Sequence, residues 1–151
     1  MNTMKKNGGF TLVELIIVIA ILAILSTGAI AGYSAYIKNA NDAAINSMLG
    51  DVYTSVVLAN AKAGAIETIL VEEASDVWTV TVTAESFDED DFANNIKDTL
   101  GATATEQEDG SYKFTLNVKT NWESSKTYAG KNAKWDDGKW GTVAAATEEE
   151  E

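Results

Sequence analysis

The chain has 151 residues and a formal net charge of −12, and it contains no histidine, cysteine, proline or arginine. Without cysteine or histidine it lacks the usual residues of disulfides, thiolate chemistry, metal sites and catalytic triads. The acidic balance argues against binding to nucleic acid or to an anionic membrane face, since both need basic surface. We therefore expect no enzyme, no cofactor and no metal.

The N-terminal part has the composition of a membrane anchor. Residues 1–9 are polar and carry only Lys5 and Lys6, and no charged residue occurs from Leu15 to Ile37. As a helix, that run would be about 35 Å long, enough to cross a hydrocarbon core of about 30 Å. The lysines before it predict a cytoplasmic N-terminus and a single-pass anchor.

The helical pattern continues beyond the anchor. Beyond Ile37 apolar residues recur at steps of three and four, which predicts one continuous helix from Phe10 to Ala63 that is amphipathic in its second half and stops at Gly64. The predicted stripe contains Ile37, Ala44, Ile45, Met48, Val52, Val56, Ala59 and Ala63. The polar residues expected off the stripe are Asn39, Asn41, Asp42, Asn46, Asp51 and Asn60.

After Gly64 the period changes to that of strands. Residues 77–83 alternate and are β-branched, which predicts a strand that buries Trp78, Val80 and Val82. A weak strand over 102–107 and the Asp109-Gly110 turn lead into a stronger one. Its inward residues would be Tyr112, Phe114, Leu116 and Val118.

A short helix and a final hairpin complete the prediction. Ser86 and Glu89 have the spacing of a capping box for a helix that ends near Gly101. Its apolar positions would be Phe87, Phe92, Ile96 and Leu100. A second Asp-Gly pair, Asp137-Gly138, lies between Trp135 and Trp140 and predicts a last hairpin.

The expected fold class is therefore α+β, with the amphipathic half of a long N-terminal helix packed on an antiparallel sheet of three to five strands. We expect five segments: a leader (1–9), an apolar helix (10–37), the amphipathic half of that helix (38–64), a globular head (65–147) and an acidic tail (148–151).

The stretch Gly8-Gly9-Phe10-Thr11-Leu12-Val13-Glu14-Leu15 resembles the prepilin cleavage motif of the type IV pilin family. The resemblance implies cleavage between Gly9 and Phe10 by a membrane prepilin peptidase, followed by N-methylation of Phe10. Glu14 matches the glutamate of the family. It would pair with the α-amino group of a neighbouring subunit and so set the assembly register, because an unpaired carboxylate in a lipid-exposed helix is costly.

The resemblance implies a structural subunit that polymerises with itself. An assembly platform would move it from the cytoplasmic membrane into a surface filament that serves adhesion, motility or DNA uptake. The alternatives are a pseudopilin of a type II secretion or competence system and a pilin-like carbohydrate-binding adhesin. No nucleic-acid binding is expected.

A secretory signal peptide is a further alternative. The apolar run and Ala29-Ile30-Ala31 match a signal sequence with its cleavage site, which would leave a soluble domain starting near Gly32. Glu14 interrupts the region that a signal sequence keeps apolar, and the apolar stripe continues past the supposed cut. Both features favour the prepilin interpretation.

The sequence departs from many family members in two respects. No proline loosens the apolar helix, so any melting on assembly should centre on Ser26 to Gly32, where Gly28 and Gly32 weaken the helix. No disulfide holds the C-terminal end, so the Trp135/Trp140 hairpin would hold it by packing. Pilins without disulfides are common in Gram-positive bacteria, and we expect such a source.

The tryptophans and the acidic clusters allow further sites. Trp122, Trp135 and Trp140 are the candidates for contact with a polysaccharide ligand, although aromatic rings in small sheet domains are more often core residues. Asp88-Glu89-Asp90-Asp91 fits the first turn of a helix better than a calcium site. Asp136-Asp137-Gly138 is interpreted as a turn, and no carboxylate pair has a spacing that indicates a glycosidase.

Overall fold

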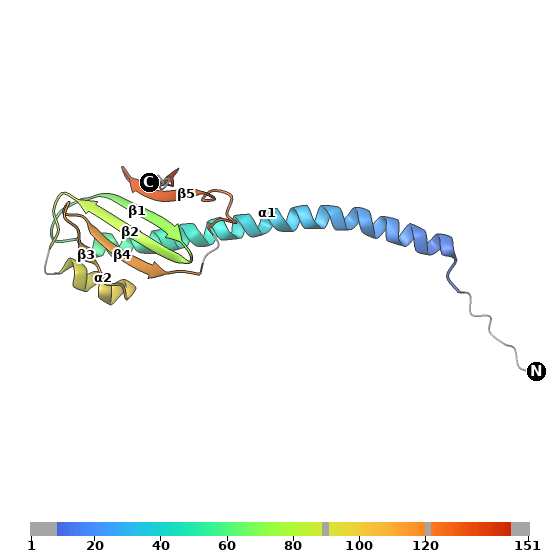
Figure 1. Ribbon diagram of the computed structural model, residues 1–151, viewed down its shortest axis with the longest axis horizontal. Helices are drawn as coiled ribbons and strands as arrows, with labels where there is room; N and C mark the ends of the chain where they lie inside the picture. The colour runs from blue at the N-terminus through green and yellow to red at the C-terminus, as the bar shows by residue number, and fades with distance from the viewer. Residues whose placement is uncertain (1–8, 89–90, 120–121, 146–151) are drawn as a thin grey trace, which may run out of the picture. The chain divides into compact units, whose positions relative to one another are not determined.

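The computed structural model describes residues 9–88, 91–119 and 122–145. The chain divides into two compact units, Met1–Ile37 and Lys38–Glu151, and helix α1 (Leu12–Ala59) contributes to both. The second unit holds a six-stranded antiparallel sheet in the order β3-β4-β2-β1-β5-β6 and a short helix α2 (Figure 1). The expected α+β class, a long N-terminal helix packed on an antiparallel sheet, is confirmed.

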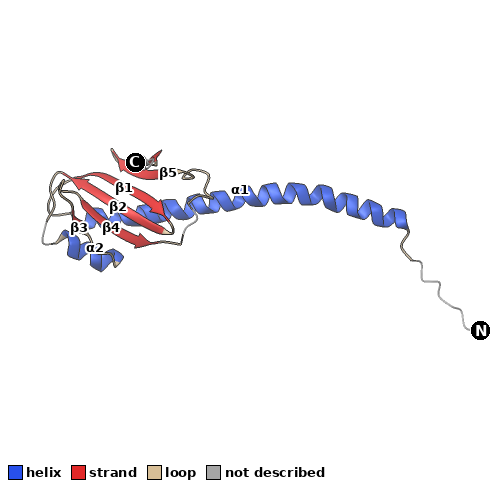
Figure 2. Ribbon diagram, in the orientation of Figure 1, coloured by secondary structure: helices blue, strands red, loops and turns tan. Residues whose placement is uncertain are grey.

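The second half of α1 buries one apolar stripe against the sheet (Figure 2). Its buried residues recur every three or four positions, which places them on one side of a 3.6-residue helix. They are Ile45, Leu49, Val52, Val56 and Ala59. The predicted stripe omitted Leu49 and included Ala44 and Ala63, which are exposed. The buried stripe is therefore turned slightly around the helix axis from the one expected.

Helix α1 ends at Ala59 and not at the expected Ala63. The next residue, Asn60, is only 1% exposed, so its expected place among the outward polar residues is wrong. Its Nδ2 donates to the carbonyl oxygens of Gly64 (3.0 Å) and Ser86 (2.9 Å). The amide therefore closes the helix end and joins it to the chain after β2. A Cβ at Gly64 would lie 2.6 Å from Ser86 Oγ and 3.1 and 3.2 Å from the Ser86 backbone nitrogen and oxygen, so this close approach favours glycine.

The sheet has six strands, one more than the upper limit of the prediction. They are β1 (Ile66–Ala74), β2 (Val77–Ala84), β3 (Thr105–Glu106), β4 (Tyr112–Asn117), β5 (Lys131–Asp136) and β6 (Lys139–Ala144). The unpredicted strand is β1, which pairs with β2 and β5 in the middle of the sheet. Its hairpin with β2 turns at Ser75 and Asp76, both at positive φ (53° and 64°) without a glycine.

The other predicted strands are present. Trp78, Val80 and Val82 of β2 are fully buried, as the alternation predicted. The weak strand over 102–107 is reduced to the two residues of β3. Asp137 and Gly138 turn β5 into β6 with φ values of 48° and 81°, the left-handed pair that an Asp-Gly hairpin requires.

Helix α2 (Phe92–Leu100) is shorter than expected. Its N-cap is Asp91, which makes no side-chain cap hydrogen bond, so the predicted helix start at Ser86 is wrong; Glu89 lies outside the described residues. Phe87 precedes the helix and packs instead against Phe92 and Tyr112, with ring centroids 4.9 and 4.7 Å apart. Aromatic packing, and not a capping box, fixes this segment. The helix ends at Gly101 as predicted.

The segment between β4 and β5 is tied to α1 by polar contacts. Asn41 Nδ2 donates to Ser124 Oγ (2.8 Å), and the Thr127 N–H and hydroxyl donate to the Asp42 carboxylate (3.1 and 3.0 Å). The Tyr128 hydroxyl donates to Asn46 Oδ1 (2.5 Å). Partial burial raises the pKa of Asp42. The hydrogen bonds from the Thr127 N–H and from the Ser125 and Thr127 hydroxyls lower it by more, so the pKa lies below its usual value.

Candidate functional site

The start of α1 presents its apolar side chains outward. Phe10 is 90% exposed, and the large apolar side chains that follow are also exposed. Gly9 is exposed, and a Cβ placed on it would meet no atom within 4 Å. The backbone on both sides of the predicted cleavage site is therefore open to an incoming enzyme.

Thr11 and Glu14 form a reciprocal capping box at the start of α1. The Thr11 N–H and hydroxyl donate to Glu14 Oε2 (2.8 and 2.7 Å), and the Glu14 N–H donates to Thr11 Oγ1 (3.3 Å). Two helix-start donors are satisfied in this way, and the carboxylate is held at the positive end of the helix dipole. The Thr-x-x-Glu spacing is a known helix-start signal, but Thr11 was not among the predicted site residues.

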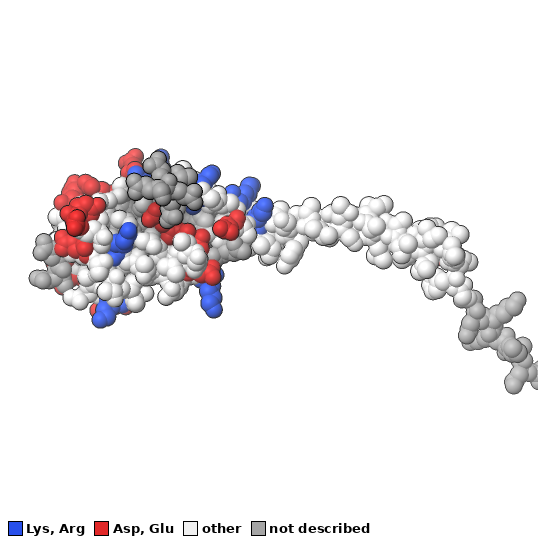
Figure 3. All heavy atoms as spheres, in the orientation of Figure 1, with Lys and Arg blue, Asp and Glu red and all other residues white. Residues whose placement is uncertain are grey.

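The apolar run after Glu14 has the length and composition of a membrane span. Charged side chains gather on the second unit, whereas the visible face of the first unit carries none among its described residues, 9–37 (Figure 3). The hydroxyls of Ser26 and Thr27 donate back to the carbonyls of Leu22 (2.6 Å) and Ala23 (3.0 Å). Such bonds satisfy a hydroxyl within its own helix, as a hydrocarbon environment demands.

The three tryptophans considered for glycan contact lie in or against the core. Trp122 is 3% exposed, and its Nε1 donates to the Lys131 carbonyl (2.7 Å). Trp135 packs on Tyr53 of α1 with ring centroids 4.9 Å apart, and Trp140 lies directly across from Trp135 in the sheet. Residues paired across two strands share a face, so Trp135 and Trp140 both lie on the α1 side. Trp135 and Trp140 stay partly exposed, and Trp140 borders a hollow on the β5–β6 hairpin.

The acidic residues do not converge. Asp91 forms an exposed ion pair with Lys62 (3.0 Å), and Asp136 forms one with Lys134 (2.9 Å). Within residues 9–88, 91–119 and 122–145, no group of three acidic side chains lies close enough to hold a metal ion. Glu89 and Asp90 of the predicted cluster, and the acidic tail 148–151, lie outside the described residues.

The chain matches one family model, the prokaryotic N-terminal methylation motif, over residues 4–30. The match covers the predicted cleavage site, the Thr11–Glu14 capping box and the first part of the apolar run. The motif implies processing by a prepilin peptidase and assembly of the processed chain with copies of itself. No solved structure matches the chain. The matched region lies wholly in the N-terminal part of the chain, outside the head.

Proposed function

We propose that this chain, which carries the N-terminal motif of type IV pilins and pseudopilins, is the structural subunit of a type IV pilus. The precursor is held in the cytoplasmic membrane by residues 10–37. Prepilin peptidase cleaves between Gly9 and Phe10, and Phe10 becomes the methylated N-terminus. An assembly platform then moves the subunit into a surface filament, where residues 65–147 form the head.

The observation that carries this proposal is the exposure of the apolar helix within the single chain. From Leu12 to Tyr36 every residue is exposed, although the segment has the composition of a buried one. Burying one Leu or Ile side chain stabilises it by about 1.5–3 kcal/mol relative to water, so this surface must be covered. Lipid covers it in the precursor, and helices of other copies cover it in the filament.

Two glycines favour close packing between such helices. Gly28 and Gly32 are four residues apart, the spacing that lets membrane helices approach closely. A Cβ at either position would meet nothing within 4 Å, so the space beside them is free within the chain. The helix is continuous through both glycines. Local melting over Ser26 to Gly32 on assembly stays a prediction.

Glu14 is proposed to set the register between copies. Cleavage after Gly9 creates a positive α-amino group next to Thr11, whose N–H and hydroxyl already hold the Glu14 carboxylate. In the filament the amine of one copy replaces these donors on Glu14 of the next. An ion pair buried among apolar helices fixes one stagger, because every other stagger leaves a charge unpaired.

The pseudopilin alternative shares this N-terminus, and no feature of the head favours it. The adhesin alternative loses support from Trp122, which is buried, whereas Trp135 and Trp140 are partly exposed and stay its candidates. The matched motif does not support the expected Gram-positive source, and that expectation is not carried further.

Mass spectrometry of protein sheared from cells, together with electron microscopy, tests the proposal. The expected result is a first residue of N-methylated Phe10 in long surface fibres. Methylated Phe10 without long fibres would favour a pseudopilin over a pilus subunit. A chain that begins near Gly32 in the culture medium would contradict both and indicate a secreted soluble domain.

A further inference from the structure

The two edges of the head's sheet differ in charge. The β5–β6 hairpin, Lys131–Ala144, contains three lysines and two aspartates, a net charge of +1. The opposite edge, Thr105–Lys113, contains Glu106, Glu108 and Asp109 against one lysine, a net charge of −2. Opposite signs on opposite edges are the pattern that lets identical subunits attract one another side by side.

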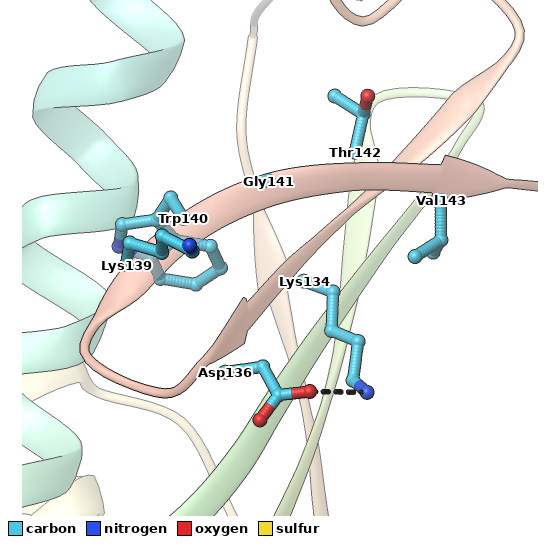
Figure 4. A pocket seen from close by; sticks show the side chains of 7 residues that line it. All are labelled: Lys134, Asp136, Lys139, Trp140, Gly141, Thr142 and Val143. Carbon is cyan, nitrogen blue, oxygen red and sulfur yellow. Dashed lines mark hydrogen bonds and ion pairs between the residues drawn. The ribbon is translucent and has the colours of Figure 1, made fainter.

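The positive edge is hollowed. A cavity of about 250 Å³ lies on the β5–β6 hairpin, lined by Lys134, Asp136, Lys139, Gly141 and Val143 among others (Figure 4). Lys134 and Asp136 point toward each other on one side, and Gly141 contributes no side chain to the middle of the strand. A Cβ at Gly141 would lie 4.0 Å from the Lys134 carbonyl oxygen, so the hollow has room for a small group there.

The negative edge projects as a rigid turn. The Asp109 carboxylate accepts hydrogen bonds from the Ser111 N–H (2.9 Å) and hydroxyl (2.6 Å), and the Gln107 N–H donates to the Ser111 carbonyl (2.8 Å). These bonds fix the turn between β3 and β4, while Glu106 and Glu108 are exposed on it. A preformed turn loses little conformational entropy on docking.

Both edges lie at the same level of the sheet. One row of paired residues runs across all six strands: Glu106, Tyr112, Val82, Ile69, Trp135 and Trp140. Lys139 is next to the last residue of this row, and Glu108 is two residues from the first. Two heads that stand side by side in the same orientation would therefore bring Glu106 and Glu108 of one level with Lys139 of the other.

We propose that the acidic β3–β4 turn of one copy docks against the lysine-bearing groove of the β5–β6 hairpin on the next copy. The contact uses side chains and not an added strand, because β3 has only two residues and Lys139 starts the edge strand β6. Since two different patches meet, the contact is heterologous, which is the type of contact that can repeat along an open filament. The inference rests on the proposed pilus function and adds a head-to-head contact to it.

Cysteine cross-linking tests the contact directly, because the natural chain has no cysteine. The full-length double variant Glu108→Cys/Lys139→Cys is expressed in the native host, and sheared filaments are oxidised. The two sites lie on opposite edges of six strands, about 24 Å apart at about 4.8 Å per strand, so a bridge within one chain cannot form. The expected result is a ladder of covalent oligomers longer than dimers that a reductant collapses.

Matched controls separate this contact from chance collisions. Each single cysteine variant should give no ladder, and neither should Lys97→Cys/Lys139→Cys, which moves one cysteine to α2. Filaments of normal length in which Glu108→Cys/Lys139→Cys stays monomeric would overturn the edge contact and leave the pilus function intact. Absence of filaments and of N-terminal processing in the natural chain would contradict the pilus function itself.

Charge reversal gives a second test that needs no oxidation. Lys139→Glu and Glu106→Lys/Glu108→Lys should each lower filament yield about two- to fivefold, the range for exposed ion pairs, with a larger loss at low salt. The combination of both should restore the yield, whereas Lys97→Glu should leave it unchanged. If Glu106→Lys/Glu108→Lys failed to restore the yield lost in Lys139→Glu, the groove would contact another partner and the proposal would be overturned.

Discussion

The two halves of helix α1 are both rich in apolar residues but meet different surroundings. In residues 12–36 the apolar side chains occur all round the helix and are all exposed within the chain. In residues 38–59 five of them form one stripe that is buried against the sheet. The difference shows that a helix folds onto its own domain where polar residues confine its apolar side chains to one side, and needs lipid or another copy where apolar side chains surround it.

The largest expected effect comes from Glu14→Gln, which should abolish most filaments and leave the head folded. Leaving one member of a buried ion pair unpaired costs about 3–5 kcal/mol, and the loss repeats at every subunit. Filament yield by shearing and electron microscopy is the measurement, with Glu123→Gln as the exposed control. Thr11→Ala removes the hydroxyl from the capping box at a cost of only about 1 kcal/mol and keeps the Glu14 carboxylate, so it should change yield far less. Normal yield from Glu14→Gln would remove the register role.

Trp78→Ala should destabilise the head while leaving membrane insertion of the first unit unchanged. Trp78 is fully buried and packs edge-on against Trp122, so truncation should lower the free energy of unfolding by about 3–5 kcal/mol. Denaturant unfolding of the purified protein measures the change. Trp78→Phe is the matched control with a smaller cost, because the Trp78 Nε1 has no hydrogen-bond partner in the described part of the chain. Equal losses from both variants would contradict this packing account.

The smallest effect expected is a pH dependence at Asp42. Its folded-state pKa lies below the usual value, so the carboxylate stabilises the folded state above the unfolded-state pKa of about 3.9 and loses this contribution as the pH falls through the folded-state value. Unfolding measured between pH 6 and pH 2 should show the decline at the acidic end. Asp42→Asn should be less stable at pH 6 and show a shallower decline. If Asp42→Asn kept the pH dependence of the natural chain, the stabilising role of the Asp42 carboxylate would be contradicted.

The sequence predicted the elements whose signals are local. The alternation of Trp78, Val80 and Val82 and the Asp137-Gly138 turn are written in neighbouring residues, and both appear as expected. Strand β1 was not predicted, because Ile69, Leu70 and Val71 are consecutive apolar residues and obscure the alternation of apolar and polar positions. Its turn at Ser75 and Asp76 also lacks the glycine that marks such hairpins.

The remaining differences between prediction and structure have two causes. Some residues bond to partners far away in the sequence, and one motif was interpreted in only one of its two roles. Asn60 is buried because Ser86, distant in the sequence, offers it an acceptor, and no helical periodicity encodes that bond. The ties from Asn41 and Asp42 to the segment before β5 are likewise long-range. Thr11 differs, since the Thr-x-x-Glu spacing was visible in the sequence, but Glu14 was interpreted only through the cleavage motif. The structure shows that Glu14 also accepts hydrogen bonds from Thr11 within its own helix, in addition to the proposed contact with another copy.

The Thr11–Glu14 bonds also bear on how the proposed subunit waits before use. A carboxylate whose donors come from its own helix start does not depend on water or on a partner for solvation. Unassembled subunits can therefore remain in the bilayer, because no carboxylate without hydrogen-bond donors drives them to associate early. Growth then becomes an exchange reaction at Glu14, in which one set of donors gives way to another, and its rate depends on how readily Thr11 releases the carboxylate.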